Sequence, residues 1–267
     1  MPSAKKSLGQ NFLVNPGYID KIITALDPKE TDTIIEIGPG KGAITKKLLQ
    51  SGALVFAVEI DPRLSDFLRQ QIGNNDRFKL IVDDALKIDF KEFLDEIKAR
   101  AKLVANLPYY ISTAILRRLI LQRNCFDFMV LMFQREVADR LLAEAGSSER
   151  GYLTVLAETF LQIEWLFDVP PSAFRPVPKV WSSVLKMKPL LEVNIDIETY
   201  SKILEISFAH KRKMLFNNLR RSDFMGLSED DWLEILQQSG ILPSYRAEDL
   251  TRQQWMKLYE VLKTWKL

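Results

Sequence analysis

The first 190 residues of the chain alternate short runs rich in β-branched and aromatic residues with amphipathic helical patterns. This alternation predicts βαβ units, and therefore a mostly parallel sheet covered by helices on both faces. The expected strands are Thr33–Ile37, Leu54–Ile60, Phe78–Val82, Lys102–Ala105, Phe128–Met132, Glu164–Val169 and Ser183–Met187. The helices expected between the first five strands are Gly42–Gln50, Arg63–Ile72, Phe90–Ala99 and Thr113–Gln122. A proline-rich stretch, Pro170–Pro178, separates the last two strands and predicts an antiparallel hairpin at one end of the sheet.

After Pro189 the sequence shows helical patterns alone. The expected helices are Glu198–Lys211, Arg212–Arg221, Glu229–Gln238 and Arg252–Trp265. We therefore expect two domains. Residues 1–190 would form a seven-stranded, Rossmann-like α/β domain, and residues 191–267 a small all-α domain.

Composition limits the chemistry that the chain can use. It contains one histidine, His210, and one cysteine, Cys125, which excludes a disulfide framework and a zinc site of Cys and His; no metal is expected. The 37 Lys and Arg against 35 Asp and Glu give a net charge of +2, which neither requires nor excludes a nucleic-acid partner. No apolar run reaches the roughly 18 residues of a membrane span, and no apolar signal core follows the N-terminus. A cytoplasmic location away from membranes is expected.

A glycine-rich turn, Glu36-Ile37-Gly38-Pro39-Gly40-Lys41-Gly42, follows the first expected strand and opens a helix. Gly38 and Gly40 allow the backbone to approach a ligand closely and to turn sharply. The spacing G-x-G-x-G differs from the G-x-G-x-x-G of dinucleotide-binding enzymes. With Glu36 in front, it favours a cofactor without phosphates. The alternative is a glycine-rich turn that binds no ligand.

Acidic residues end the next two strands. Glu59 ends the second strand, where a carboxylate can accept hydrogen bonds from both hydroxyls of a ribose. Asp83 and Asp84 end the third strand, and we expect Asp84 to accept a hydrogen bond from the amino group of an adenine. Ribose and adenine without phosphate indicate S-adenosylmethionine, with NAD as the alternative. The α/β domain is therefore expected to be a class I, S-adenosylmethionine-dependent methyltransferase domain.

The fourth expected strand leads directly into Asn106-Leu107-Pro108-Tyr109. Ligands of open α/β sheets bind at the carboxyl ends of the strands, so this tetrapeptide faces the site. An aromatic amine is a poor nucleophile because its lone pair is delocalised into the ring. The Asn106 side-chain oxygen and the Leu107 carbonyl can accept its two N–H groups, favour a pyramidal nitrogen and aim the lone pair at a methyl donor. Pro108 directs the Leu107 carbonyl outward, and Tyr109 offers a ring for base stacking.

Together with other segments, these motifs resemble the small-subunit ribosomal RNA adenine dimethyltransferases, the KsgA/RsmA family. The matching segments are Gly9–Leu13, Glu36–Gly42, Val58–Asp61, Asp84-Ala85, Asn106–Ser112, Phe133–Ala138 and Pro170–Val180. The resemblance implies dimethylation at N6 of two adjacent adenines in the 3′-terminal hairpin of small-subunit RNA during ribosome biogenesis. It implies S-adenosylmethionine as methyl donor and the immature small ribosomal subunit as partner.

The resemblance also implies which residues act. Those implied to hold the cofactor are Asn11, Leu13, Gly38, Gly40, Glu59, Asp84 and Asn106. Those implied to form the catalytic site are Asn106, Leu107, Pro108, Tyr109 and Phe174. Tyr109 and Phe174 are implied to hold the target adenine from its two faces after it has left its stack.

A basic window, Phe208–Arg221, carries five Lys or Arg residues and no acid. We expect it to form a helical edge that contacts RNA phosphates, with a merely solvated helix face as the alternative. The residues expected to contact RNA are Lys179, Lys211, Arg212, Lys213, Arg220 and Arg221.

Other functions stay open at this point. Large-subunit adenine methylases of the antibiotic-resistance type resemble the same pattern but usually carry Ile at the position of Leu107. A ribosome assembly or transcription factor would keep the fold without needing an intact Asn106–Tyr109 segment. A small-molecule methyltransferase or an NAD enzyme would need neither the helical tail nor the basic window. We expect a monomer.

Overall fold

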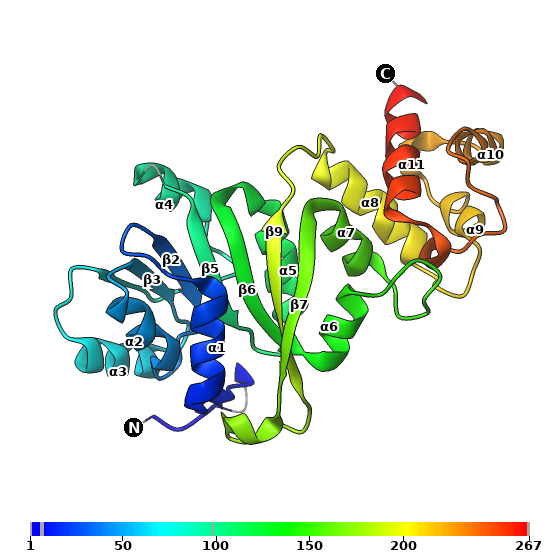
Figure 1. Ribbon diagram of the computed structural model, residues 1–267. Helices are drawn as coiled ribbons and strands as arrows, with labels where there is room; N and C mark the ends of the chain where they lie inside the picture. Colours follow the sequence, from blue (N-terminus) through cyan, green and yellow to red (C-terminus); the bar gives the residue numbers. More distant parts are fainter. Residues whose placement is uncertain (1, 6–7, 98, 266–267) are drawn as a thin grey trace. The chain divides into compact units, whose positions relative to one another are not determined.

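The computed structural model describes residues 2–5, 8–97 and 99–265 (Figure 1). Within these residues, one mixed sheet has seven strands in the order β4-β3-β2-β5-β6-β9-β7. They are β2 (Thr33–Ile37), β3 (Leu54–Val58), β4 (Phe78–Ile81), β5 (Ala101–Asn106), β6 (Phe126–Gln134), β7 (Leu161–Val169) and β9 (Ser182–Pro189). The strands from β4 to β6 are parallel, whereas β9 pairs antiparallel with both β6 and β7. The predicted α/β sheet and its antiparallel hairpin are confirmed.

Six helices of the described residues accompany the parallel strands: α2 to α5 connect them, α1 precedes β2 and α6 follows β6. They are α1 (Pro16–Leu26), α2 (Ala43–Gln50), α3 (Pro62–Ile72), α4 (Phe90–Glu96), α5 (Ser112–Leu121) and α6 (Arg135–Leu141). The side chains of Asn15, Asp61 and Asp89 accept hydrogen bonds from backbone N–H groups at the starts of α1, α3 and α4. Proline follows the first two of these caps, where its fixed φ suits the first helical position. The sequence analysis missed α1 and α6, although the pair Asn15-Pro16 is a helix-start signal.

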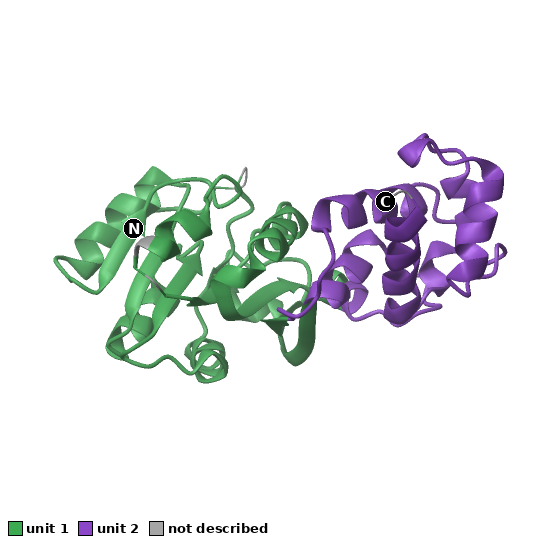
Figure 2. Ribbon diagram, turned by 90° about the horizontal axis from the view of Figure 1, so that it is seen from above, with its two compact units in different colours: residues 1–138, 161–189 green, residues 139–160, 190–267 purple. Residues whose placement is uncertain are grey.

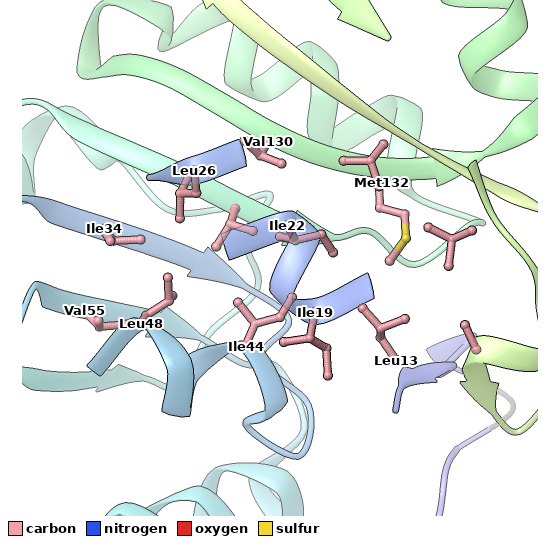
Figure 3. Packing of buried hydrophobic residues seen from close by; sticks show 14 of the residues in the cluster. Leu13, Ile19, Ile22, Leu26, Ile34, Ile44, Leu48, Val55, Val130 and Met132 are labelled. Carbon is pink, nitrogen blue, oxygen red and sulfur yellow. The ribbon is translucent and has the colours of Figure 1, made fainter. Parts of the chain in front are cut away.

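A buried hydrophobic cluster joins α1 and α2 to one face of the sheet (Figure 3). From α1 it takes Ile19, Ile22 and Leu26, which recur at helical spacing. From β6 it takes the alternate residues Val130 and Met132. These spacings bring one stripe of a helix against one face of a strand. Burial of apolar surface contributes about 25 cal/mol per Å² and is the main interaction that holds these helices against the sheet.

The chain divides into two compact units (Figure 2): Met1–Ala138 with Leu161–Pro189, and Asp139–Phe160 with Leu190–Leu267. The sequence places residues 139–160 in the first domain, whereas the structure groups them with the second unit. The reason is the packing of α7 (Tyr152–Phe160) on the C-terminal helices. Within that unit, the Phe160 and Tyr200 rings lie 5.9 Å apart, and the Tyr200 hydroxyl lies 3.0 Å from that of Thr159.

The second unit is helical. After α7 it contains α8 (Ile197–Phe208), α9 (Leu215–Leu219), α10 (Glu229–Gln238) and α11 (Arg252–Trp265). The predictions for α10 and α11 are confirmed, but the first two expected helices are too long. The Asn218 side chain donates hydrogen bonds to the carbonyls of Ser207 and His210 at 2.7 and 3.2 Å, which stabilises a turn between α8 and α9 instead. Among the described residues, no helix combines the length and apolar character that a bilayer crossing requires.

Candidate active site

The carboxyl ends of β2, β3, β4 and β5 meet at one edge of the sheet, where a pocket opens. Its walls are the segment Leu8–Phe12, the turns after the four strands and the start of α5. Every residue that lines it belongs to the first unit. The predicted site residues that it brings together are Asn11, Gly38, Gly40, Glu59, Asp84, Asn106, Leu107, Pro108 and Tyr109.

The turn after β2 uses glycines in the left-handed region of backbone space. Gly38, Gly40 and Gly42 have φ angles of 69°, 58° and 79°. A side chain at Gly40 would also lack space, because a Cβ there would lie 2.8 Å from Cδ1 of Phe12. The Gly38 amide donates to the Val58 carbonyl at 2.9 Å and ties the turn to the end of β3. The backbone of this turn therefore forms part of the pocket wall without side chains, which allows a ligand to approach it closely.

Glu59 presents a buried carboxylate at the end of β3 and is 4% exposed. Its oxygens accept hydrogen bonds from the backbone amides of Asp61 at 2.9 Å and Gly40 at 3.2 Å. Burial raises the pKa of Glu59, and these hydrogen bonds oppose the shift. A carboxylate has about four acceptor positions, so about two remain for the hydroxyls of a ligand. This geometry suits the predicted contact with a ribose.

A second buried carboxylate, Glu36, lies beside the glycine turn and is 2% exposed. Its Oε2 accepts a hydrogen bond from the Thr45 hydroxyl at 2.6 Å. Burial raises the pKa of Glu36 to about 7, the hydrogen bond from Thr45 opposes the shift, and the charge of Glu59 adds to it. When Glu36 is protonated, the negative charge of this pair of buried acids lies on Glu59.

Two aspartates follow β4, and both line the pocket. Asp83 accepts a hydrogen bond from the backbone amide of Asp84 at 2.7 Å, and Asp84 accepts one from that of Leu86 at 3.0 Å. These local turns fix the two carboxylates at the rim. Asp84 is partly buried and Asp83 is exposed, which favours Asp84 as the partner of an adenine amino group. That role stays a prediction.

The orientation of the Asn106 amide is set by the N-terminal segment. Asn106 Nδ2 donates a hydrogen bond to the backbone carbonyl of Asn11 at 3.0 Å. With the nitrogen engaged, the side-chain oxygen is the group that can accept from a ligand. The Leu107 amide donates to the Met132 carbonyl at 3.3 Å, which holds the turn against β6. The structure therefore directs the Asn106 nitrogen to Asn11, and the role of the Asn106 oxygen and the Leu107 carbonyl as acceptors for a target amine stays a prediction.

A second pocket adjoins the first and shares Phe12, Gly38, Gly40 and Asn106 with it. Leu13 lines this second pocket rather than the first. Asn106 therefore borders both spaces. A residue that acts between a cofactor and a target base has to occupy such a position.

Tyr109 and Phe174 lie in different surroundings. Tyr109 lines the pocket, its hydroxyl lies 2.8 Å from that of Ser182, and burial raises its pKa. Phe174 is 0% exposed and belongs to the hydrophobic cluster. It is held there because the two-residue strand β8 (Phe174–Arg175) pairs with β1 (Phe12–Leu13). Phe174 lines neither this pocket nor the adjoining one, so its implied contact with the target base stays a prediction.

The sequence analysis assigned no role to Gln10 or Asp61, which form a hydrogen-bonded pair at the site. Gln10 lines the pocket, and its Nε2 donates to Asp61 Oδ2 at 3.2 Å. The pair Asp61-Pro62 is a recognisable helix-start signal. Its contact with Gln10 has no local signal, because the two residues are 51 positions apart.

The predicted RNA-contacting residues are mostly exposed, but their backbone differs from the prediction. Those that are exposed are Lys179 in the first unit and Lys211, Arg212, Lys213 and Arg221 in the second. Residues 211–213 lie in the turn after α8, not on a helical edge, because the Asn218 contacts stabilise that turn. Arg220 is partly buried and pairs with Glu229 at 2.7 Å.

The pocket's own groups fit S-adenosylmethionine. Glu59 and Asp84 offer acceptors for ribose hydroxyls and an adenine amino group, whereas no described lysine or arginine lines the pocket. The pyrophosphate of a dinucleotide would place negative charge near these carboxylates without a basic partner, so the pocket favours the phosphate-free cofactor. Among the described residues, no three His, Cys, Asp or Glu side chains converge as metal ligands do.

A family model described as ribosomal RNA adenine dimethylase matches residues 1–264. The ribosomal RNA small subunit methyltransferase A of Halothermothrix orenii is 38% identical over 263 residues, covering 96% of this chain and 87% of the relative. The protein of the same description from Hahella chejuensis is 41% identical over 221 residues, covering 82% and 81%.

Two solved structures agree with this similarity. A dimethyladenosine transferase from Plasmodium falciparum superposes with a TM-score of 0.82 at 28% identity, covering 95% of this chain and 98% of its own. The 23S rRNA methyltransferase ErmE superposes with a TM-score of 0.70 at 22% identity, covering 95% and 100%. At that lower identity, the second comparison supports the fold alone.

Proposed function

Because the chain belongs to the ribosomal RNA adenine dimethylase family, we propose that it dimethylates N6 of two adjacent adenines in the 3′-terminal hairpin of small-subunit RNA. It is an S-adenosylmethionine-dependent ribosomal RNA adenine methyltransferase, as its family and relatives establish. The proposal concerns the target: which adenines, on which RNA and in which particle.

The observation that carries the chemistry is the anchored amide of Asn106. Its nitrogen binds the Asn11 carbonyl, so its oxygen and the neighbouring Leu107 carbonyl can accept the two N–H groups of an adenine amine. This contact favours a pyramidal nitrogen whose lone pair leaves the ring. When bound, S-adenosylmethionine supplies an electrophilic methyl group. The methylated ammonium is acidic and loses its proton to water, so the site needs no dedicated base.

The target base must leave its stack to reach Asn106. Tyr109 lines the pocket, as Phe12 and Tyr110 also do, and follows Asn106 most closely in the reactive segment; stacking on its ring would contribute about 1–3 kcal/mol per base. Phe174 is tied to Leu13 through the pairing of β8 with β1. A direct contact of Phe174 with the base would require its ring to leave the hydrophobic cluster.

The relatives support the small subunit as the source of the RNA. Curated proteins that match most of the chain at 36–41% identity are described as ribosomal RNA small subunit methyltransferase A. The similarity to a large-subunit methylase is weaker and concerns the fold. We propose an immature small ribosomal subunit in the cytoplasm as the substrate particle, and a monomer as the active form.

We propose that phosphates of the same RNA bind the exposed basic residues, which are Lys179, Lys211, Arg212, Lys213 and Arg221, with the partly buried Arg220 beside them. Neutralising phosphates releases condensed counterions, so binding should weaken steeply as salt increases. Replacing Arg212 and Lys213 by alanine should reduce the slope of log affinity against log salt concentration. An unchanged slope would show that these two residues do not contact RNA phosphates.

Methyl transfer to two substrates in parallel tests the proposal. Labelled S-adenosylmethionine is offered with immature small subunits lacking the modification and with naked large-subunit RNA, and digests are analysed for N6,N6-dimethyladenosine. Label on the small subunit alone is expected. Label on the large-subunit RNA would move the chain to the resistance type. Absence of label on both, with cofactor bound, would favour an assembly factor that retains the fold.

A further inference from the structure

We propose that Gln10 is a positioning residue for methyl transfer. By binding Asp61 it holds the N-terminal segment, residues 8–12, in the place where the Asn11 carbonyl orients the side chain of Asn106. The inference rests on the proposed function and adds a residue that lies outside the predicted contacts with cofactor and base.

The anchor of this contact is a rigid carboxylate. The side chain of Asp61 is 0% exposed, and its oxygens accept hydrogen bonds from Nε and Nη2 of Arg63 at 3.1 and 2.7 Å. These bonds from Arg63 lower the pKa of Asp61 to about 2. Asp61 also accepts from the Arg63 backbone amide at the start of α3, so it is fixed to a helix. Gln10 therefore meets an ionised acceptor that several hydrogen bonds hold at the start of α3.

Both ends of the Gln10 amide are engaged. Its Nε2 donates to Asp61 Oδ2 at 3.2 Å, and its Oε1 accepts from the Lys5 backbone amide at 2.7 Å. The Lys5 ammonium lies 3.8 Å from Asp61 Oδ1. Lys5 and Gln10 are thus both tied to Asp61 in the turn after β3.

The next residue carries this constraint to the reactive segment. The Asn11 carbonyl accepts the hydrogen bond from Asn106 Nδ2 at 3.0 Å, close to the ordinary N–H···O distance. Movement of the segment by about 1 Å would break it, because the bond weakens beyond about 3.5 Å. The two orientations of an amide have nearly the same shape, so packing alone would not keep the Asn106 oxygen toward the ligand. The Asn11 carbonyl supplies that preference, and Gln10 holds the carbonyl in place.

Residues 8–12 also pack closely against neighbouring aromatic rings and the glycine turn. A Cβ on Gly9 would lie 3.0 Å from Cδ1 of Tyr110, and one on Gly40 would lie 2.8 Å from Phe12. The Lys41 ammonium lies 4.9 Å from the centre of the Phe12 ring. These contacts are largely apolar and do not select an amide orientation. The pairing of β1 with β8 holds Phe12 and Leu13 on one side of Asn11, and the Gln10–Asp61 bond is the side-chain anchor on its other side.

The first test replaces Gln10 by alanine. With RNA and cofactor both saturating, kcat should fall about tenfold, the factor that about 1.4 kcal/mol represents. The Kd of S-adenosylmethionine, measured by calorimetry, should change less than about threefold. Gln71→Ala is the matched control, because Gln71 is an exposed glutamine that accepts from Lys46 at 3.2 Å outside the site. An unchanged kcat, or a loss confined to cofactor affinity, would overturn the proposal.

The second test uses Gln10→Glu and a pH profile. In its ionised form the introduced carboxylate would repel Asp61, whereas in its protonated form it can donate its O–H to Asp61 and restore the contact. The charged groups around this position are Lys5, Asp61 and Arg63, with Glu59 close behind. The ratio of variant to wild-type kcat should therefore rise as the pH falls from about 8 to about 5.5. A ratio that stays flat contradicts a role through this hydrogen bond, and a general folding defect would not produce the rise.

The third test asks whether Gln10 acts through Asn106. In an Asn106→Ala background, Gln10→Ala should lower kcat by less than about twofold, because the group that it positions is absent. The same tenfold loss in both backgrounds would show an independent effect and refute the proposal. Wild-type turnover on immature small subunits is measured first. Its absence would refute the proposed function, whereas an active wild type with unaffected Gln10 variants would refute positioning alone.

Discussion

Replacing Gly40 by alanine asks whether the glycine turn and the N-terminal segment form one wall of the cofactor pocket. Gly40 has a φ of 58°, and a Cβ there would lie 2.8 Å from Cδ1 of Phe12. Carbon atoms prefer separations of about 3.5–4.0 Å, so the Phe12 ring has to retreat by about 0.7 Å or more. The ring is attached to residues 8–12, which line the pocket, so the wall moves with it.

Two separate losses are expected from Gly40→Ala. An L-residue in the left-handed region costs about 1–2 kcal/mol, which lowers the stability of the fold. Displacement of the wall adds a loss of cofactor affinity. We expect the Kd of S-adenosylmethionine to rise about tenfold, equivalent to about 1.4 kcal/mol, because the Asn11 and Glu59 sides of the pocket no longer meet the ligand together.

Gly240→Ala is the matched control, because it shares the strain without the clash. Gly240 has a φ of 67°, and a Cβ there would meet nothing within 4 Å. Calorimetric titration and thermal unfolding of both variants separate the two effects. Both midpoints should fall by roughly 2–4 °C per kcal/mol of strain, and only Gly40→Ala should bind the cofactor more weakly. Wild-type affinity in Gly40→Ala, or an equal loss in Gly240→Ala, would refute the reasoning.

Variants at three further positions test other parts of the structure. The pKa of Glu36 rises from 4.5 to about 7 on folding, so the free energy of unfolding should fall as the pH rises through that range. Urea unfolding of Glu36→Gln should show a flatter dependence of that free energy on pH. A wild-type dependence in the variant would exclude Glu36 as its source. Tyr109→Phe should raise the KM for RNA less than about fivefold, whereas Tyr109→Ala should raise it about 10–100-fold, because only alanine removes the stacking ring. Equal effects of the two variants would assign the role of Tyr109 to its hydroxyl, which bonds Ser182. Phe174→Ala should lower the free energy of unfolding by about 3–5 kcal/mol, since the ring is fully buried, whereas a loss below about 1 kcal/mol would contradict its place in the core.

The sequence predicts the sheet well because each strand is a short apolar run with turn signals on both sides. Thr33–Ile37 is the clearest example, since all five of its residues are buried and its bounds agree with the prediction. Local signals also locate the acids at the ends of β3 and β4. These features depend on residues close together in the chain, so local sequence patterns contain the information that defines them.

Long-range contacts account for most of what the sequence analysis missed. The assignment of α7 to the second unit depends on its packing with Tyr200, 41 positions beyond Thr159. The burial of Phe174 depends on strand pairing with Leu13. The turn after α8 depends on side-chain hydrogen bonds from Asn218, where the charge pattern by itself suggests a continuous helix.

The single-turnover rate of methyl transfer by Asn106→Ala tests the central claim most directly. It is measured on immature small subunits with cofactor binding determined in the same preparation, and the wild-type product is identified as N6,N6-dimethyladenosine. If the Asn106 oxygen holds the target amine, the rate should fall by about tenfold or more while the cofactor still binds. A rate within about threefold of the wild type would contradict the account.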